Sequence, residues 1–319
     1  MLHLRIVAPA DRSADVVELL GSEPGATNVL LLRGAAVEPE GDLVMCDVAR
    51  EAAHPLLARL RALGLTERGS IAVEQIDMAL SRVADRAEEA APGHPADALV
   101  WEEVTVRTSE ESALSATFLA FMCIATMIAG VGVLLDQPIL VVGAMVVGPE
   151  FGAVAGLCVA LVRRQSALAG RSARALLVGF PVGIAVTVLA TLLGRAAGLV
   201  EPSMLDGSHP LTAFVSRPDA FSFVVAFLAG VAGMLSLTSA KSGALIGVLI
   251  SVTTIPAAGY VGVAFALGHL APAGGAALQL TINLCSMLVA GVCTLLVQGR
   301  LWRYARGRRS RHGHSTVGA

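Results

Sequence analysis

Two hydrophobic patterns divide the chain at about residue 112. Before that point, apolar positions alternate with polar ones or recur every three to four residues, as in the strands and helices of a soluble domain. After it, apolar runs of about twenty residues follow one another with few charges inside them. Helices of this length cross the roughly 30 Å hydrocarbon core of a bilayer. The pattern predicts a soluble N-terminal part followed by a polytopic membrane part.

Residues 1–76 predict a small α+β domain. The pattern of apolar positions gives four strands and two helices in the order βαββαβ, which is the ferredoxin-like motif. The predicted strands cover residues 2–8, 28–33, 43–48 and 70–76, and the predicted helices cover 11–20 and 51–63. Asp11 or Ser13 is available as the N-cap of the first helix.

The same 76 residues carry no recognisable catalytic motif. The segment contains no Gly-rich phosphate loop, no metalloprotease helix and no nucleophile with a base at a known spacing. His3 and His54 are single histidines that belong to no such motif. We expect a regulatory or assembly role for this domain, and we expect that the protein is not an enzyme.

Residues 77–111 predict a helical linker. A charged helix over 77–91 ends at a Pro-Gly-His-Pro breaker over 92–95, and Trp101 is typical of a residue at the membrane interface. Thr108 followed by Glu111 resembles a capping box that opens the first transmembrane helix.

Residues 112–299 predict a six-helix transmembrane domain, and residues 300–319 form a basic tail. The expected spans are 113–135, 139–162, 175–194, 220–238, 242–268 and 276–299. Arginines gather between spans two and three and in the tail, which carries six of them and no acid. The positive-inside rule then places both termini in the cytoplasm of a bacterial cell, with the spans in its inner membrane.

The second and fifth spans share an unusual feature, since glycines and a proline interrupt each of them. Each is the middle helix of a three-span half, so the two halves would form an inverted repeat. Interrupted helices at matching positions of such a repeat indicate a binding site near the bilayer midplane. The interruptions are Gly143, Gly148, Pro149, Gly152 and Gly156 in the second span, and Gly243, Gly247, Pro256, Gly259 and Gly262 in the fifth.

Glu150 is the one charged residue inside the six expected spans. A charge at this depth usually serves function, so we expect Glu150 to accept a proton or a cation. Polar residues of the fifth and sixth spans would complete a path for a solute or ion. The expected path residues are Gly148, Pro149, Glu150, Gly152, Thr253, Thr254, Pro256 and Asn283, with Gln279 and Thr281 near the last.

Packing offers a second interpretation of the same residues. Glycines four residues apart, as at 148, 152 and 156, let helices or subunits approach closely. Pro149 would then only kink its helix, and Thr253 and Thr254 would satisfy carbonyls that Pro256 leaves open. A water-accessible cavity that reaches Glu150 favours transport, whereas a dry Glu150 bonded to a neighbouring helix favours a scaffold.

Cofactors, metals and nucleic acid find no support in the composition. The five cysteines form no C-x-x-C pair, and four of them lie in apolar segments, where they serve as small core residues. The tail arginines directly follow a span and lack interleaved aromatic residues beyond Trp302 and Tyr304. Topology and contact with anionic lipids explain these arginines better than nucleic-acid binding.

Two segments resemble a known family. The run from Leu134 to Pro149, and the run from Gly243 to Ile250 that ends at Ile255-Pro256, are similar to the motifs of bacterial hydrophobic membrane proteins grouped as domain of unknown function, family 389. The resemblance covers about residues 108–298. It implies a fold and a membrane location but no activity. Members more often carry Pro-Leu-Met-Gly-Pro after the Gly-Ala-Met run, so Glu150 is a feature of this chain.

The first hypothesis is a transporter or channel for a small solute or ion, with the N-terminal domain as its regulatory part. The alternative is a membrane scaffold or ligand sensor that works by oligomerisation without transport. The bilayer is the expected surrounding in both cases. Sheet edges and glycine seams also predict a homo-oligomer.

Overall fold

The computed structural model describes residues 1–76, 78–91, 100–206, 212, 220–239 and 254–313. Their contacts divide the chain into two compact units. The first unit holds Met1–Glu102, Thr238–Lys241 and Gln298–Ala319, and the second holds Glu103–Leu237 and Ser242–Val297.

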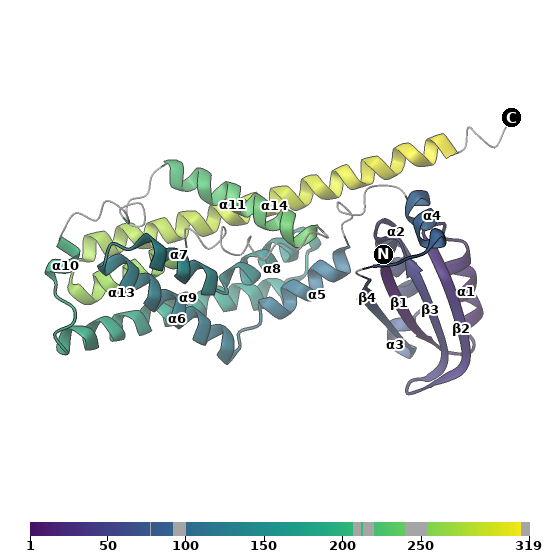
Figure 1. Ribbon diagram of the computed structural model, residues 1–319, viewed down its shortest axis with the longest axis horizontal. Coiled ribbons are helices and arrows are strands. Elements are labelled where there is room, and N and C mark those ends of the chain that lie inside the picture. Colours follow the sequence, from purple (N-terminus) through teal and green to yellow (C-terminus); the bar gives the residue numbers. More distant parts are fainter. Residues whose placement is uncertain (77, 92–99, 207–211, 213–219, 240–253, 314–319) are drawn as a thin grey trace. The chain divides into compact units, whose positions relative to one another are not determined.

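A four-stranded antiparallel sheet with helices on one face forms the first unit (Figure 1). The strand order is β2-β3-β1-β4. The strands are β1 (Leu2–Ala8), β2 (Ala26–Val37), β3 (Glu40–Val48) and β4 (Ser70–Gln75), and the helices are α1 (Ser13–Gly21), α2 (Arg50–Ala62) and the short α3 (Leu65–Arg68). Each strand and helix expected before residue 76 is therefore present, and β2 extends beyond its predicted ends.

Alternating side chains explain why this sheet forms. Leu4 and Ile6 of β1 are fully buried, while Arg5 between them is exposed, so one face of the strand meets the core. Leu56 and Leu60, one helical turn apart on α2, pack into the same cluster. The core thus arises from a period of two in the strand and of about four in the helix.

The start of α1 corrects one expectation. Neither Asp11 nor Ser13 caps the helix, because Arg12 occupies the N-cap position, and its side chain makes no capping hydrogen bond. Asp11 instead forms an ion pair with Arg68 at 3.1 Å, and the Ser13 hydroxyl donates to the carbonyl of Ala10. The ion pair holds the pKa of Asp11 below its usual value, mainly through hydrogen bonding with Arg68.

Residues after β4 also belong to the first unit. Helix α4 (Arg82–Ala90) begins later than predicted, because Ser81 caps it by accepting hydrogen bonds from the amides of Val83 and Ala84. Val100 is buried in the core of the sheet and its helices. The breaker over 92–95 lies outside the described residues.

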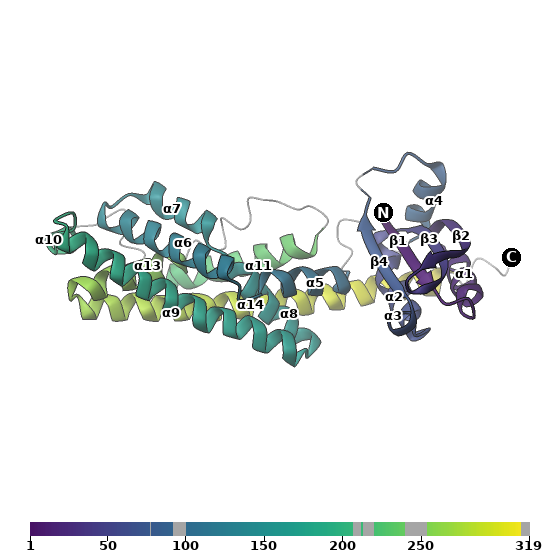
Figure 2. The same cartoon turned by 90° about the horizontal axis from the view of Figure 1, so that it is seen from below.

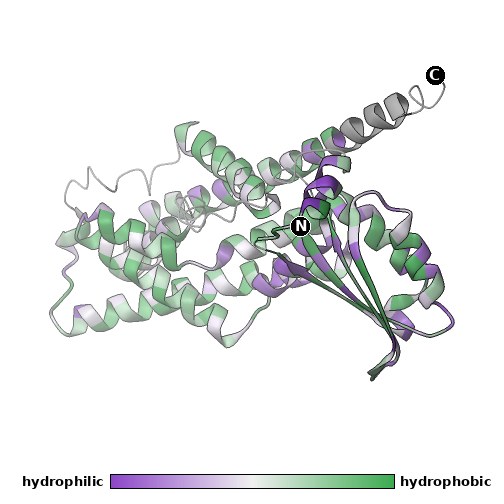
Figure 3. Ribbon diagram, turned by 45° about the vertical axis from the view of Figure 1, so that its right-hand side comes forward, coloured by the Kyte–Doolittle hydropathy of each residue, from purple (hydrophilic) through white to green (hydrophobic). Residues whose placement is uncertain are grey.

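The second unit consists of helices (Figures 1 and 2). Hydrophobic residues predominate along them (Figure 3). They are α6 (Ala116–Leu134), α7 (Pro138–Val147), α8 (Glu150–Arg163), α9 (Ser166–Ala196), α10 (Ser203–Asp206) and α13 (Ile255–Leu267), together with most of α5 (Trp101–Glu111), α11 (Ala220–Thr238) as far as Leu237, and α14 (Leu270–Gly313) as far as Val297.

Four described helices are long and apolar enough to cross a membrane, and a bent pair, α7 with α8, makes a fifth candidate. These helices indicate a membrane-embedded protein. The predicted count of six is not confirmed, because much of the expected fifth span, residues 242–253, lies outside the described residues and α13 is the short helix that follows it. Spans three and six are longer than predicted, as α9 and α14 show.

The first span does not open with the predicted capping box. Thr108 lies inside α5, where its hydroxyl donates to the carbonyl of Val104 at 2.7 Å. Ser115 is the N-cap of α6, and its side chain accepts a hydrogen bond from the amide of Phe118 at 3.0 Å. The expectation was wrong because Ser115, which lies closer to the apolar run than Thr108, offers the same kind of acceptor.

Small residues bring α6, α9 and α13 into close contact. A β-carbon added at Gly259 would lie 2.7 Å from the Cβ atom of Ala129, and one at Gly262 would lie 2.8 Å from Cβ of Thr187. The hydroxyl of Thr126 on α6 donates to the carbonyl of Gly183 on α9 at 3.0 Å. Glycine therefore sets the distance between these helices.

Candidate functional site

The second predicted span is interrupted at Gly148 and Pro149. α7 ends at Val147, Gly148 adopts an extended conformation, and Pro149 precedes α8 as its N-cap residue. A proline disfavours helical geometry in the residue before it and donates no backbone hydrogen bond, so a continuous helix is broken here. The two helices meet at an angle of 53°.

Glu150 follows this break directly as the first residue of α8. Its side chain is 0% exposed. The hydroxyl of Thr254 donates a hydrogen bond of 2.7 Å to Oε1 of Glu150, across 104 residues of sequence. This contact joins the break in the second span to the start of α13.

The two partners of this hydrogen bond both lie at helix N-termini. Thr254 is the N-cap residue of α13, and Pro256 is in its first turn, where a proline is well tolerated. Backbone amides at a helix start carry partial positive charge and favour a carboxylate nearby. The ends of α8 and α13 therefore provide an environment in which Glu150 can be buried.

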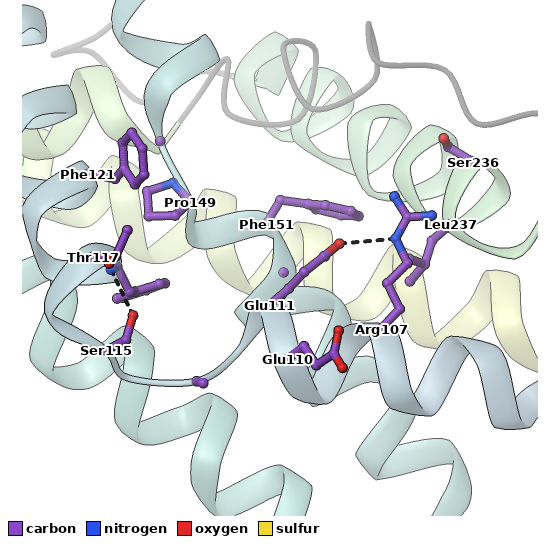
Figure 4. A pocket seen from close by; sticks show the side chains of 14 residues that line it. Arg107, Glu110, Glu111, Ser115, Thr117, Phe121, Pro149, Phe151, Ser236 and Leu237 are labelled. Atoms are coloured by element: carbon purple, nitrogen blue, oxygen red, sulfur yellow. Dashed lines mark hydrogen bonds and ion pairs between the residues drawn. The ribbon is translucent and has the colours of Figure 1, made fainter. Parts of the chain in front are cut away.

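A cavity of about 460 Å³ lies beside the same break (Figure 4). We call it the break cavity. It is lined by Arg107, Glu110, Glu111, Ala113, Ser115, Thr117, Phe118, Phe121, Gly148, Pro149, Phe151, Gly152, Ser236 and Leu237. Glu150 and Pro256 are not among these residues, although Pro149 and Phe151 on either side of Glu150 are.

The charged wall of the break cavity comes from α5. Arg107 donates from Nε to Oε1 of Glu111 at 3.0 Å, one helical turn away, and Glu110 lies next to this pair (Figure 4). Phe121 and Phe151 supply an apolar wall from α6 and α8. The cavity thus offers both charged and aromatic groups to a ligand.

The remaining predicted path residues are placed as follows. A β-carbon at Gly152 would overlap Cβ of Glu111, so this glycine lets α8 approach α5. Asn283 is buried on α14 and accepts a hydrogen bond from Nε2 of Gln279 at 3.4 Å. Thr281 is exposed and bonds to the carbonyl of Ala277 in its own helix. Thr253 lies outside the described residues.

The contribution of α5 to the break cavity was not predicted from the sequence. Arg107 and Glu111 were assigned to a linker, although their spacing of four residues is typical of an ion pair on a helix. Thr254 was predicted as a path residue, with satisfaction of carbonyls near Pro256 as the packing alternative, and its hydroxyl is bound to Glu150. Groups of three or more His, Cys, Asp or Glu side chains that could hold a metal are not found among the described residues.

The region around this site is similar in sequence to a known family. Residues 145–289 match the family described as Domain of unknown function (DUF389). The DUF389 match includes Glu150 and Thr254, and it confirms the resemblance that the sequence motifs indicated. The first unit's sheet lies before the matched range.

One relative extends this comparison. An uncharacterized protein of Methanocaldococcus jannaschii is 24% identical over 215 residues, which cover 66% of this chain and 64% of the relative. The match therefore spans less than two thirds of the relative's length. No solved structure matches the chain. Neither the family description nor the relative's name assigns an activity.

Proposed function

We propose that the protein is a membrane transporter or channel for a small solute or ion, and that Glu150 accepts a proton or cation on its path. The hydrogen bond between Thr254 and Glu150 carries this proposal. Through this bond Glu150, the charged residue of the interrupted second span, contacts the start of α13. Half-helix ends that converge on an ionisable group are typical of transporter binding sites.

Helix packing supports the inverted repeat that this function implies. α13 belongs to the second half of the membrane part and packs on α6 and α9 of the first half. Conversely, α8 of the first half packs on α14 of the second half: Cys158 lies against Gly291, and its Sγ lies 3.6 Å from the carbonyl of Leu288. Each half therefore places the later part of its middle span against helices of the other half.

The first unit supports a cytoplasmic regulatory or assembly role. The order of its elements and its antiparallel strand order β2-β3-β1-β4 support a ferredoxin-like domain. The arginines at the end of α8, in the turn after it and in the first turns of α9 favour an orientation with both termini on the cytoplasmic side of the inner membrane.

The alternative function, a scaffold or sensor that acts as a homo-oligomer, is favoured by the burial of Glu150. This carboxylate is dry and bonded to a neighbouring helix, and the break cavity does not include it. Gly152 and Gly156 also have packing roles, since added β-carbons would meet Glu111 and Ser172. Transport requires that α8 and α13 separate enough to admit water to Glu150.

Flux measurements on proteoliposomes test the two functions. Vesicles containing a pH-sensitive dye report proton entry, and separate assays with Na⁺, K⁺ and phosphate report the movement of those ions. Glu150→Gln keeps the size of the side chain and removes its charge, so we expect flux to fall to the level of empty vesicles. Thr254→Val is expected to alter flux in the same assay because it removes the donor to Glu150.

Glu201→Gln is the matched control, because Glu201 is exposed and outside the candidate spans. Equal flux in wild type and Glu150→Gln would remove Glu150 from the mechanism. If wild type moves none of the four probes faster than empty vesicles, transport of these ions is contradicted and the scaffold is favoured.

A further inference from the structure

A second cavity lies at the start of α9 and shares no lining residue with the break cavity. Its volume is about 390 Å³. We call it the arginine cavity. Three elements contribute to it: α5, the turn after α8 and the first turns of α9. The lining residues are Thr105, Ser109, Arg164, Gln165, Ser166, Ala167, Leu168 and Arg171.

The charge of this cavity is positive. Arg164 and Arg171 both line it, and none of the described lining residues is acidic. Neither arginine forms an ion pair with a carboxylate in the described part of the chain. Arg171 donates from a guanidinium nitrogen to the hydroxyl of Ser109, so this contact joins α9 to α5 at the cavity wall.

A turn in the backbone positions Arg164. It ends α8 as the C-cap residue in the left-handed region, with φ 55° and ψ 41°, and α9 begins two residues later. A non-glycine residue rarely adopts this conformation. Arg164 precedes the first residue of α9 and Arg171 follows it in the chain. The turn brings both residues to the same cavity.

The start of α9 adds further donors. Gln165 is its N-cap residue without a side-chain hydrogen bond, and its first turn contains no acid. The first amides of a helix lack partners within the helix and carry partial positive charge. Residues 166–168, which supply such amides, line the cavity together with the hydroxyls of Thr105 and Ser109.

We propose that the arginine cavity binds a phosphate group. A phosphate offers several acceptor oxygens to two guanidinium groups, whose planar donors suit it well. The cavity lies where a phosphate is available, because α9 has 31 residues and measures about 46 Å, longer than a bilayer core of about 30 Å. The first turns of α9 therefore reach the headgroup region, where an anionic phospholipid or free phosphate is the source.

Binding to the full-length protein in neutral detergent tests this site. The probes are short-chain phosphatidylglycerol, diacylglycerol of the same chain length and inorganic phosphate, each titrated by calorimetry. We expect phosphate-containing probes to bind and diacylglycerol not to bind. The double variant Arg164→Asn with Arg171→Gln should bind about thirtyfold more weakly, since each arginine near an anionic group contributes roughly fivefold.

Arg164→Asn alone separates binding from folding. Asparagine tolerates the left-handed conformation better than arginine, so this variant should keep its thermal stability and lose about fivefold in affinity. Arg195→Gln, with the same loss of charge near the other end of α9, should bind as wild type does.

The probes identify the source of the phosphate. Binding of phosphatidylglycerol without binding of inorganic phosphate supports a lipid headgroup, and competition by inorganic phosphate supports a soluble ligand. The proposal is overturned if wild type binds neither phosphate probe, or if the double variant binds as tightly as Arg195→Gln. Failure of ion flux in proteoliposomes would leave this result unaffected, because the site does not depend on transport.

Discussion

Gly259 and Gly143 are both glycines in apolar helices, but their surroundings differ. A β-carbon at Gly259 would lie 2.7 Å from Cβ of Ala129 and 2.8 Å from the carbonyl oxygen of Thr126, whereas one at Gly143 meets nothing within 4 Å. Glycine at position 259 is therefore required for packing, and at position 143 it is not.

Gly259→Ala should destabilise the protein by about 1–3 kcal/mol, because α13 and α6 must move apart. Gly143→Ala is the control and should be neutral or stabilising, since alanine favours a helix over glycine by up to about 1 kcal/mol. Thermal unfolding in detergent compares the two. A similar loss in both variants would contradict a specific contact at Gly259.

At the scale of elements, two residues near the start of α6, Thr108 and Ser115, could each cap the helix. Ser115→Ala removes the acceptor for the amide of Phe118 and should cost about 1 kcal/mol of stability. Thr108→Val keeps the side-chain volume and removes only a hydroxyl that bonds within α5, so its effect should be smaller. Thermal unfolding of both variants measures the difference. A larger loss in Thr108→Val would restore the predicted capping box.

The sequence predicted those elements whose cause is local. Pro149 interrupts a helix wherever that helix lies, so the break was predicted correctly at the residues where the bend occurs. The alternation in β1 likewise predicted a strand with one buried face. These features depend on neighbours within a few residues.

Partners distant in sequence could not be predicted in the same way. Thr254 and Glu150 were both predicted as path residues from the two helix breaks, but no periodicity indicated that these residues, 104 apart, form a direct hydrogen bond. The charged wall of the break cavity also depends on how α5 packs against α8, through the contact between Glu111 and Gly152. A linker assignment from charge alone gave no indication of that contact.

At the scale of the whole molecule, the first unit extends beyond the predicted boundary at residue 76. Val100 is buried in its core, and Glu102 accepts from His54 at 2.8 Å and from Arg61 at 3.3 Å. Burial raises the pKa of Glu102, but the hydrogen bond and charge of His54, together with Arg61, lower the pKa below its usual value of 4.5.

A fragment of residues 1–102 should therefore be more stable than a fragment of residues 1–76. Burial of Val100 alone contributes about 1.5–3 kcal/mol. Since the folded form lowers the pKa of Glu102, its contribution is present above pH 4.5 and is lost as the pH falls through the lowered value. Circular dichroism with urea at pH 7 and pH 4 measures both effects. Equal stability at pH 7 would place the boundary at residue 76.

The shortness of α7 has an electrical consequence. Its ten residues measure about 15 Å, so in the proposed insertion the break lies near the middle of a core about 30 Å thick. A proton or cation that reaches Glu150 from one side crosses about half of the membrane potential, which amounts to roughly 1.1 kcal/mol per 100 mV. Occupancy of this carboxylate would then change about sevenfold per 100 mV. Under the proposed function, the broken span would make the charge state of Glu150 respond to voltage as well as to concentration.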